Sequence, residues 1–224
     1  MTSGLLAAAL LLGVSTPSKA VSIDEFDGET TTTSTPFTFD AATILGGERD
    51  VNPSSNASFS STGGAATFNL LSGIANVQIY YDGNDDDAGL GFGLGAFDLT
   101  AGGADRFLFA VTAITSNPAV AITVYDSSGN SIRSGPFTLT STGNYEILFS
   151  SLSIVTGTGA NLTGANSVQL TVSDNTASGG PGSLTLDYLR TNSAATPSVP
   201  EPSSVVLMGL GLAACGIWRR KRAS

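Results

Sequence analysis

The chain has 224 residues, of which nine are Lys or Arg and eighteen are Asp or Glu, and it contains no histidine and one cysteine, Cys215. This composition excludes a Ser-His-Asp or Cys-His catalytic site, the usual zinc ligand sets and an intrachain disulfide. Residues 21–196 hold four arginines against seventeen acids, a net charge of −13. Such a body repels phosphate backbones, so no nucleic-acid partner is expected.

A secretion signal is predicted in residues 1–20. Leu5–Val14 is an apolar stretch of ten residues, which is too short to span a bilayer as a helix. Pro17 follows it, and Ser18-Lys19-Ala20 has the small-x-small pattern of a cleavage site. We therefore expect a signal helix that is removed after Ala20, and an exported protein.

Residues 21–192 are predicted to form one all-β domain, a two-sheet jelly-roll-like sandwich. Thr30–Thr35 is a threonine/serine run typical of a flexible loop or a glycosylated segment. Apolar and polar residues then alternate with period two in Thr67–Leu71, Val77–Tyr81, Arg106–Thr115, Val120–Asp126, Tyr145–Phe149, Ser167–Ser173 and Ser183–Arg190. Turns rich in Gly, Asn and Asp separate these stretches, as expected for half-buried strands. Such strands bury their apolar faces best as two packed sheets, with Val168, Leu170 and Val172 buried together.

An acidic turn at residues 82–87, Asp-Gly-Asn-Asp-Asp-Asp, holds four carboxylates in six residues. A divalent cation would relieve their mutual repulsion. The turn begins like an EF-hand loop, but Asp87 and Gly93 stand where that loop needs glycine and glutamate. The sequence therefore favours a solvated turn, because Asp and Asn are good turn formers.

Residues 193–198 form a linker of small residues, and residues 199–224 form a tail with three parts in order. The parts are the motif Pro200, Glu201, Pro202, the uncharged apolar span 203–218, and the basic cluster Arg219, Arg220, Lys221, Arg222. A helix over the span would cover about 24 Å, slightly less than the ~30 Å hydrocarbon layer, which local thinning can accommodate. We expect a short transmembrane helix whose basic end stays cytoplasmic while the body faces outward.

This tail resembles the PEP-CTERM sorting signal of exported bacterial proteins. The resemblance rests on the three parts just named and covers roughly the last twenty-five residues. It implies processing by an exosortase, a membrane-embedded cysteine transpeptidase that cuts near the Pro-Glu-Pro motif. It also implies a precursor held in the inner membrane and a mature protein at the cell surface or in the extracellular matrix. Without cleavage, the same tail would be a plain membrane anchor.

The body resembles carbohydrate-binding-type jelly rolls with a galactose-binding-like fold. The likeness lies in Ile23–Gly28 as an opening strand and in Ser183–Arg190 as a closing strand. In that family the first and last strands are neighbours and often share a structural calcium ion. The resemblance thus implies Asp24, Asp27 and Asp187 as calcium ligands, and otherwise the three are separate surface acids. No other cofactor is expected.

Aromatic side chains limit what the body could do with a glycan. Trp218 belongs to the tail, so the candidates for sugar stacking are Tyr80, Tyr81, Tyr125, Tyr145 and Tyr188. Tyr80 and Tyr81 must point to opposite faces of a strand.

We expect a surface or matrix protein with a structural or interaction role. A module that binds exopolysaccharide is the alternative. Enzyme activity is not expected, since nothing marks a pair of acids as the catalytic pair of a glycoside hydrolase.

We predict that the protein made by its host ends near Pro202 and so lacks Cys215 and Trp218. Glu201→Ala should leave the uncut precursor in the inner membrane, because the apolar span still anchors it. Neutral residues in place of the basic cluster should instead let the tail misorient. Intact-mass spectrometry of the native protein measures the outcome, and a mature species that still contains Trp218 would reduce the tail to an ordinary anchor.

Overall fold

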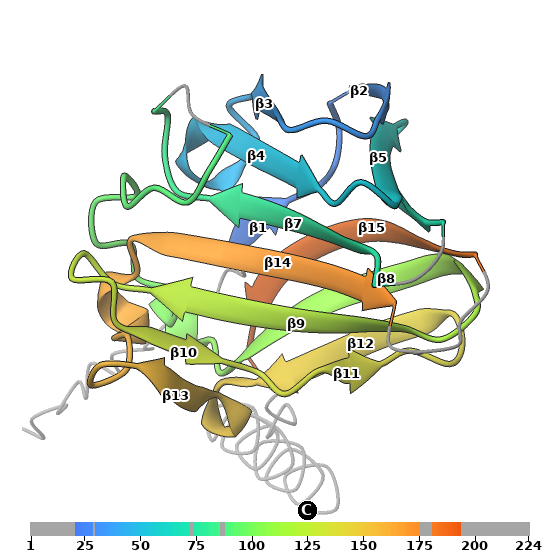
Figure 1. Ribbon diagram of the computed structural model, residues 1–224. Helices are drawn as coiled ribbons and strands as arrows, with labels where there is room; N and C mark the ends of the chain where they lie inside the picture. Colours follow the sequence, from blue (N-terminus) through green and yellow to red (C-terminus); the bar gives the residue numbers. More distant parts are fainter. Residues whose placement is uncertain (1–20, 29, 72–73, 86–87, 175–180, 194–224) are drawn as a thin grey trace, which may run out of the picture. The chain divides into compact units, whose positions relative to one another are not determined.

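The computed structural model describes residues 21–28, 30–71, 74–85, 88–174 and 181–193, which form a sandwich of two antiparallel β-sheets (Figure 1). The predicted all-β sandwich is therefore confirmed. The signal segment, the tail and most of the linker lie outside the described residues. Within the described part of the chain, no helix is long and apolar enough to cross a membrane.

The seven-stranded sheet has the order β12-β8-β15-β6-β5-β2, with β1 also paired to β15. Its strands are β1 (Ser22–Asp24), β2 (Thr30–Thr33), β5 (Ala57–Thr62), β6 (Ala65–Leu70), β8 (Arg106–Thr115), β12 (Gly143–Leu148) and β15 (Gly182–Asn192). Ser22 pairs with Arg190, so the first and last strands are neighbours, as the resemblance implied. The expected loop at the threonine run is wrong in part, because β2 pairs with β5 and threonine suits strands.

The eight-stranded sheet has the order β13-β10-β9-β14-β7-β4-β3, with β11 also paired to β9. Its strands are β3 (Phe37–Asp40), β4 (Glu48–Pro53), β7 (Asn76–Tyr81), β9 (Pro118–Tyr125), β10 (Ser131–Arg133), β11 (Phe137–Thr138), β13 (Ser153–Thr156) and β14 (Ser167–Asp174). Four short 3-10 turns complete the described elements: η1 (Leu45–Gly47), η2 (Ala101–Gly103), η3 (Phe149–Ser151) and η4 (Leu162–Gly164). Each of the seven predicted stretches overlaps one strand, with ends that differ by at most two residues.

The core lies between the sheets and follows the period-two pattern. Val168, Leu170 and Val172 are all 0% exposed, which confirms their predicted burial. Tyr81 also belongs to this core, whereas Tyr80 lies on the outer face, as strand alternation requires. Burial of one such apolar side chain contributes about 1.5–3 kcal/mol.

A buried ion pair connects the two sheets. Arg49 of β4 donates from Nη1 to Asp24 Oδ2 at 2.8 Å and from Nη2 to Ser61 Oγ at 3.0 Å. The same Asp24 oxygen accepts the hydroxyl of Tyr81 at 3.1 Å, and its other oxygen accepts the amide of Phe26 at 2.8 Å. Three phenyl rings surround the guanidinium at 5.1–5.6 Å from their centroids: Phe26, Phe39 and Phe59. Because β4 and β7 belong to one sheet and β1 and β5 to the other, the network fixes how the sheets face each other.

We predict that Asp24→Asn lowers the free energy of unfolding of the full chain by about 3–5 kcal/mol, because it leaves a buried guanidinium without its counter-charge. Glu146→Gln is the matched control: it breaks the partly exposed pair with Arg106 and should cost less than about 1 kcal/mol. Denaturant titration measures both. Equal losses in the two variants would contradict a special role for the buried pair.

Candidate functional site

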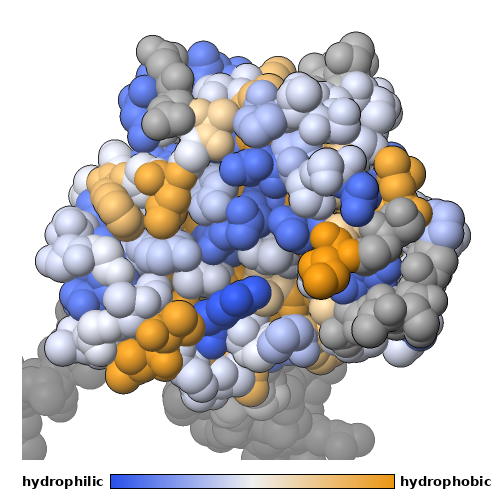
Figure 2. Space-filling model, viewed as in Figure 1, coloured by the Kyte–Doolittle hydropathy of each residue, from blue (hydrophilic) through white to orange (hydrophobic). Residues whose placement is uncertain are grey.

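A continuous row of polar side chains crosses the outer face of the eight-stranded sheet. Strand register places one residue from each of six adjacent strands side by side: Thr38, Asp50, Tyr80, Gln169, Thr123 and Arg133. We call these six residues the polar row. With strands about 4.8 Å apart, the row spans about 24 Å. Figure 2 faces this sheet and shows hydrophilic residues over its middle, with hydrophobic groups nearer the margins.

The residues in the middle of the polar row are largely buried. Thr123 is 3% exposed, Gln169 6% and Tyr80 8%, so neighbouring groups shield much of their surface. Hydrogen bonds hold the tyrosines in place: Tyr80 donates to Gln78 Oε1 at 2.9 Å, and Tyr125 donates to Gln169 Oε1 at 3.0 Å. The middle of the polar row thus consists of amide, hydroxyl and phenol groups in fixed positions.

The polar groups of this face include neutral phenols and two buried atoms without a hydrogen-bond partner among the described residues. Burial raises the pKa of Tyr80 and of Tyr125, so both phenols stay protonated and neutral at ordinary pH. The Nε of Arg133 and the Oγ of Ser167 are buried and make no hydrogen bond within the described residues. Buried polar groups normally find a partner, so an ordered water is expected beside these two atoms.

An aromatic pair stands at one side of the row. Phe92 is 41% exposed, and its ring makes a T-shaped contact with Tyr125 at 6.2 Å between centroids. Asn166 fixes this loop: its Nδ2 donates to the Phe92 carbonyl at 3.2 Å, and its backbone carbonyl accepts a hydrogen bond from the Leu94 amide at 3.2 Å. Sequence reasoning missed Phe92, because it considered only tyrosines. The available signal was an aromatic residue between two glycines, Gly91 and Gly93.

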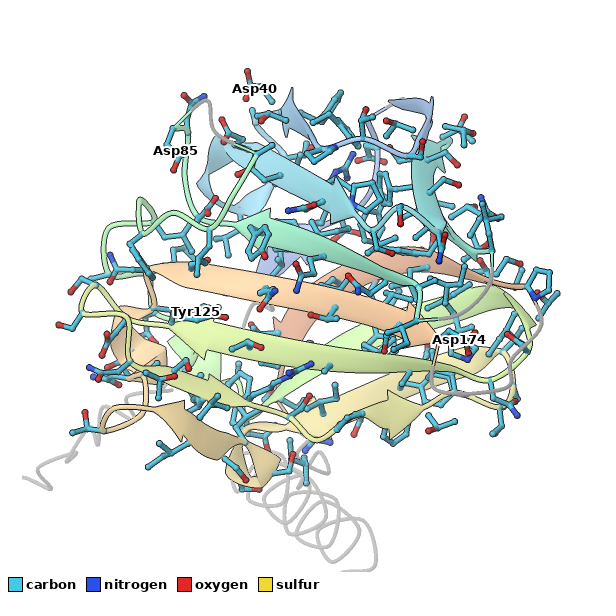
Figure 3. The ribbon with its side chains drawn as sticks, in the orientation of Figure 1. Asp40, Asp85, Tyr125 and Asp174 are labelled. Carbon is cyan, nitrogen blue, oxygen red and sulfur yellow. The ribbon has the colours of Figure 1, made fainter. Side chains whose placement is uncertain are left out.

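Four acids gather near the end of the polar row that lies on β3 and β4. One carboxylate oxygen from each of Glu48, Asp50, Asp82 and Asp85 lies within 4.8 Å of the other three. We call these residues the carboxylate cluster. Glu48, Asp50 and Asp82 are 0% exposed, and Asp85, in the loop after β7, is exposed (Figure 3). The expected solvated turn is therefore wrong for Asp82, whose side chain the loop covers.

Burial and mutual repulsion dominate the electrostatics of the cluster. Burial, assisted by the charges of Asp82 and Glu48 and opposed by the Thr38 side chain, raises the pKa of Asp50 to about 8. Burial also raises the pKa of Asp82, although the Gly91 amide donates to its carboxylate. Both oxygens of Asp50 and Oδ1 of Asp82 accept no hydrogen bond of standard geometry from the described part of the chain. A set of oxygen ligands alone suits a hard cation such as calcium or magnesium.

The three predicted calcium ligands lie in different surroundings. Asp24 is buried in the Arg49 network, whereas Asp27 follows β1 and Asp187 lies on β15, both exposed. Among the described residues, these three acids do not form a group like the carboxylate cluster. A calcium ion at Asp24, Asp27 and Asp187 stays a prediction, and Asp24 has a guanidinium as its neighbour.

Two of the five candidate tyrosines, Tyr80 and Tyr125, lie on the face of the polar row. Tyr81 is in the core, and Tyr145 is partly buried against Phe109, with ring centroids 5.7 Å apart. Tyr188 belongs to the other sheet, and the Arg190 guanidinium lies 4.0 Å from its ring centroid.

Residues 198–222 match the family model of the PEP-CTERM protein-sorting motif. The predicted sorting tail is thus confirmed, with Pro200, Glu201, Pro202 and the basic cluster inside the match. The motif marks an exported protein that is sorted to the cell surface and implies processing by an exosortase. No curated protein matches the chain.

The body is similar to solved β-sandwich structures at low identity. One is a family 11 carbohydrate-binding module of the cellulase Lic26A-Cel5E of Clostridium thermocellum, at 14% identity and TM-score 0.47, covering 82% of this chain and 100% of that chain. A mutant of the family 29 module CBM29-2 has 16% identity and TM-score 0.39, covering 72% and 86%. The agarase AgWH50C has 12% identity and TM-score 0.45, covering 66% and 23%. Likeness at this level carries no information about the ligand of the present chain.

We predict that, in a chelating buffer, the free energy of unfolding falls as the pH rises from about 4 to about 8 and then levels off. The raised pKa makes folded Asp50 hold a proton that the unfolded chain releases near its ordinary value of 3.8, so folding binds protons in this window. Asp50→Asn cannot titrate, so its stability should fall less over the same window. Denaturant midpoints between pH 4 and 9 measure the difference. Parallel profiles for the two proteins would contradict it.

Proposed function

We propose that this exported surface protein binds a neutral polysaccharide chain along the polar row. The observation that carries the proposal is the row itself: fixed amide, hydroxyl and phenol groups on the outer face of a sheet. The sorting tail supports it, because a protein delivered to the cell surface meets polysaccharides there.

The chemistry of the row matches that of a sugar. Sugar hydroxyls both donate and accept hydrogen bonds, and Gln169, Thr123 and Arg133 supply partners of both kinds. The rings of Tyr125 and Phe92 offer apolar surface for the flat faces of pyranose rings. The net charge of −13 over residues 21–196 favours a neutral glycan over an anionic one.

We propose binding without hydrolysis. A glycoside hydrolase needs two carboxyl groups that flank the scissile bond. In the carboxylate cluster, Glu48, Asp50 and Asp82 are completely buried, so a sugar on the outer face does not reach them.

A structural role in the matrix is the second candidate, and the edge strand β13 favours it. Ile154 is 63% exposed and Val155 59% exposed on this strand. Edge strands present unpaired backbone groups, and apolar edges promote pairing between chains. Association through β13 would build an assembly without any glycan ligand.

We predict that the full chain binds neutral oligosaccharides and that Gln169→Ala or Tyr125→Ala weakens binding about tenfold, through lost hydrogen bonds and ring contact. Tyr188→Ala is the matched control, because it removes a tyrosine from the other sheet and should leave affinity unchanged. An array of neutral oligosaccharides that also holds exopolysaccharide from the producing cells identifies the ligand, and calorimetry measures affinity.

Absence of binding to every neutral glycan on the array would refute the proposal, as would equal losses in Tyr125→Ala and Tyr188→Ala. Concentration-dependent self-association that Ile154→Asp abolishes, together with absence of glycan binding, would establish the structural role instead.

A further inference from the structure

We propose that Glu48, Asp50, Asp82 and Asp85 hold a calcium ion that joins β4 to the loop that follows β7. The site is independent of the glycan proposal, because it needs only the four acids and the cation.

The geometry of the cluster fits one ion. Calcium binds oxygen at about 2.3–2.6 Å, so two ligands on opposite sides of it lie about 4.6–5.2 Å apart. The four carboxylate oxygens lie within 4.8 Å of one another, inside that limit. Asp85 is exposed, which gives an ion from solvent a way into a cluster that is otherwise buried.

Asp50 gives an independent indication of a missing partner. Its side chain is 0% exposed and belongs to the group of converging oxygens, yet neither of its oxygens accepts a hydrogen bond of standard geometry from a described residue. Oδ1 of Asp82 is likewise buried without a hydrogen-bond partner of standard geometry in the described part of the chain. Buried carboxylates without donors are costly, and a bound cation satisfies both oxygens and both charges.

The donor set selects calcium among the common cations. The four ligands are carboxylates, which suit hard ions, whereas zinc and copper prefer imidazole or thiolate. Magnesium usually keeps several waters and binds through one or two carboxylates, whereas calcium accepts an all-protein cage with more oxygens.

Glycines let the loop close over the cluster. A Cβ on Gly83, whose φ is +97°, would lie 2.6 Å from the Gly93 carbonyl carbon, and a Cβ on Gly93 would lie 2.6 Å from the Asp82 carbonyl oxygen. Only glycine permits this approach. Because Gly83 lies against Gly93 beside Phe92, the cation would fix the segment that carries Phe92 as well as β4.

The test uses the full chain, stripped of metal with a chelator. Calorimetric titration with calcium chloride should show one strong site. At calcium about 100-fold above its dissociation constant, the melting temperature should rise by about 5–10 °C. Terbium should bind the same site, and its emission on tyrosine excitation should fall in Tyr80→Phe, because Tyr80 is the register neighbour of Asp50.

Asp50→Asn separates this site from a purely structural cluster. In chelator it should be as stable as the native chain or more so, because one buried repulsion is removed. In calcium it should lose the increase in melting temperature, and its affinity should fall at least about tenfold. Asp27→Asn and Asp187→Asn are the controls, and both should keep the full response to calcium.

Two outcomes would overturn the assignment. Equal melting temperatures in calcium and in chelator would mean that the carboxylates share protons and hold no cation. A calcium response that survives Asp50→Asn but disappears in Asp187→Asn would place the ion between β1 and β15.

Discussion

The buried pair of Arg49 and Asp24 is the constraint on which the other features depend. Arg49 points inward from β4, so strand alternation sends Glu48 and Asp50 to the outer face. A shift of the β4 pairing register by one residue would turn both acids into the core. Burying two carboxylates there without partners would cost too much free energy for the fold to form. The pair thus sets the position of the carboxylate cluster and of one end of the polar row, while it joins the two sheets.

The sandwich contains two kinds of buried acid. Salt bridges in the described part of the chain join Asp24, Asp105 and Glu146 to arginines, and neither Asp50 nor Asp82 takes part in one. A guanidinium balances the charge of Asp24 within the protein. Asp50 and Asp82 have no such guanidinium among the described residues and depend on protons or on an ion from outside, which makes this end of the sheet sensitive to the medium around the cell.

Sequence reasoning predicted the strands with regular alternation, because apolar residues at every second position report burial directly. It missed β4, since three consecutive charged residues, Glu48 to Asp50, resemble a loop until their partners are known. Arg49 pairs with Asp24 of β1, and Glu48 and Asp50 face Asp82 and Asp85 in the loop after β7, both far away in the chain. The calcium prediction correctly assumed that β1 and β15 are adjacent strands. It could not foresee that Arg49 forms an ion pair with Asp24. Phe92 escaped notice because its role depends on the distant Tyr125.

The place of β15 in its sheet has a mechanical consequence. This eleven-residue strand lies between β8 and β6 and also pairs with β1, and Thr191 donates its amide to the Val21 carbonyl at 2.8 Å. A pull on the chain beyond Asn192, along the strand axis, would load the hydrogen bonds to both neighbours in shear and all at once. A terminal edge strand would instead peel away one bond at a time. The body is thus built to resist extension from its carboxyl end, as flow imposes on a protein tethered at a surface.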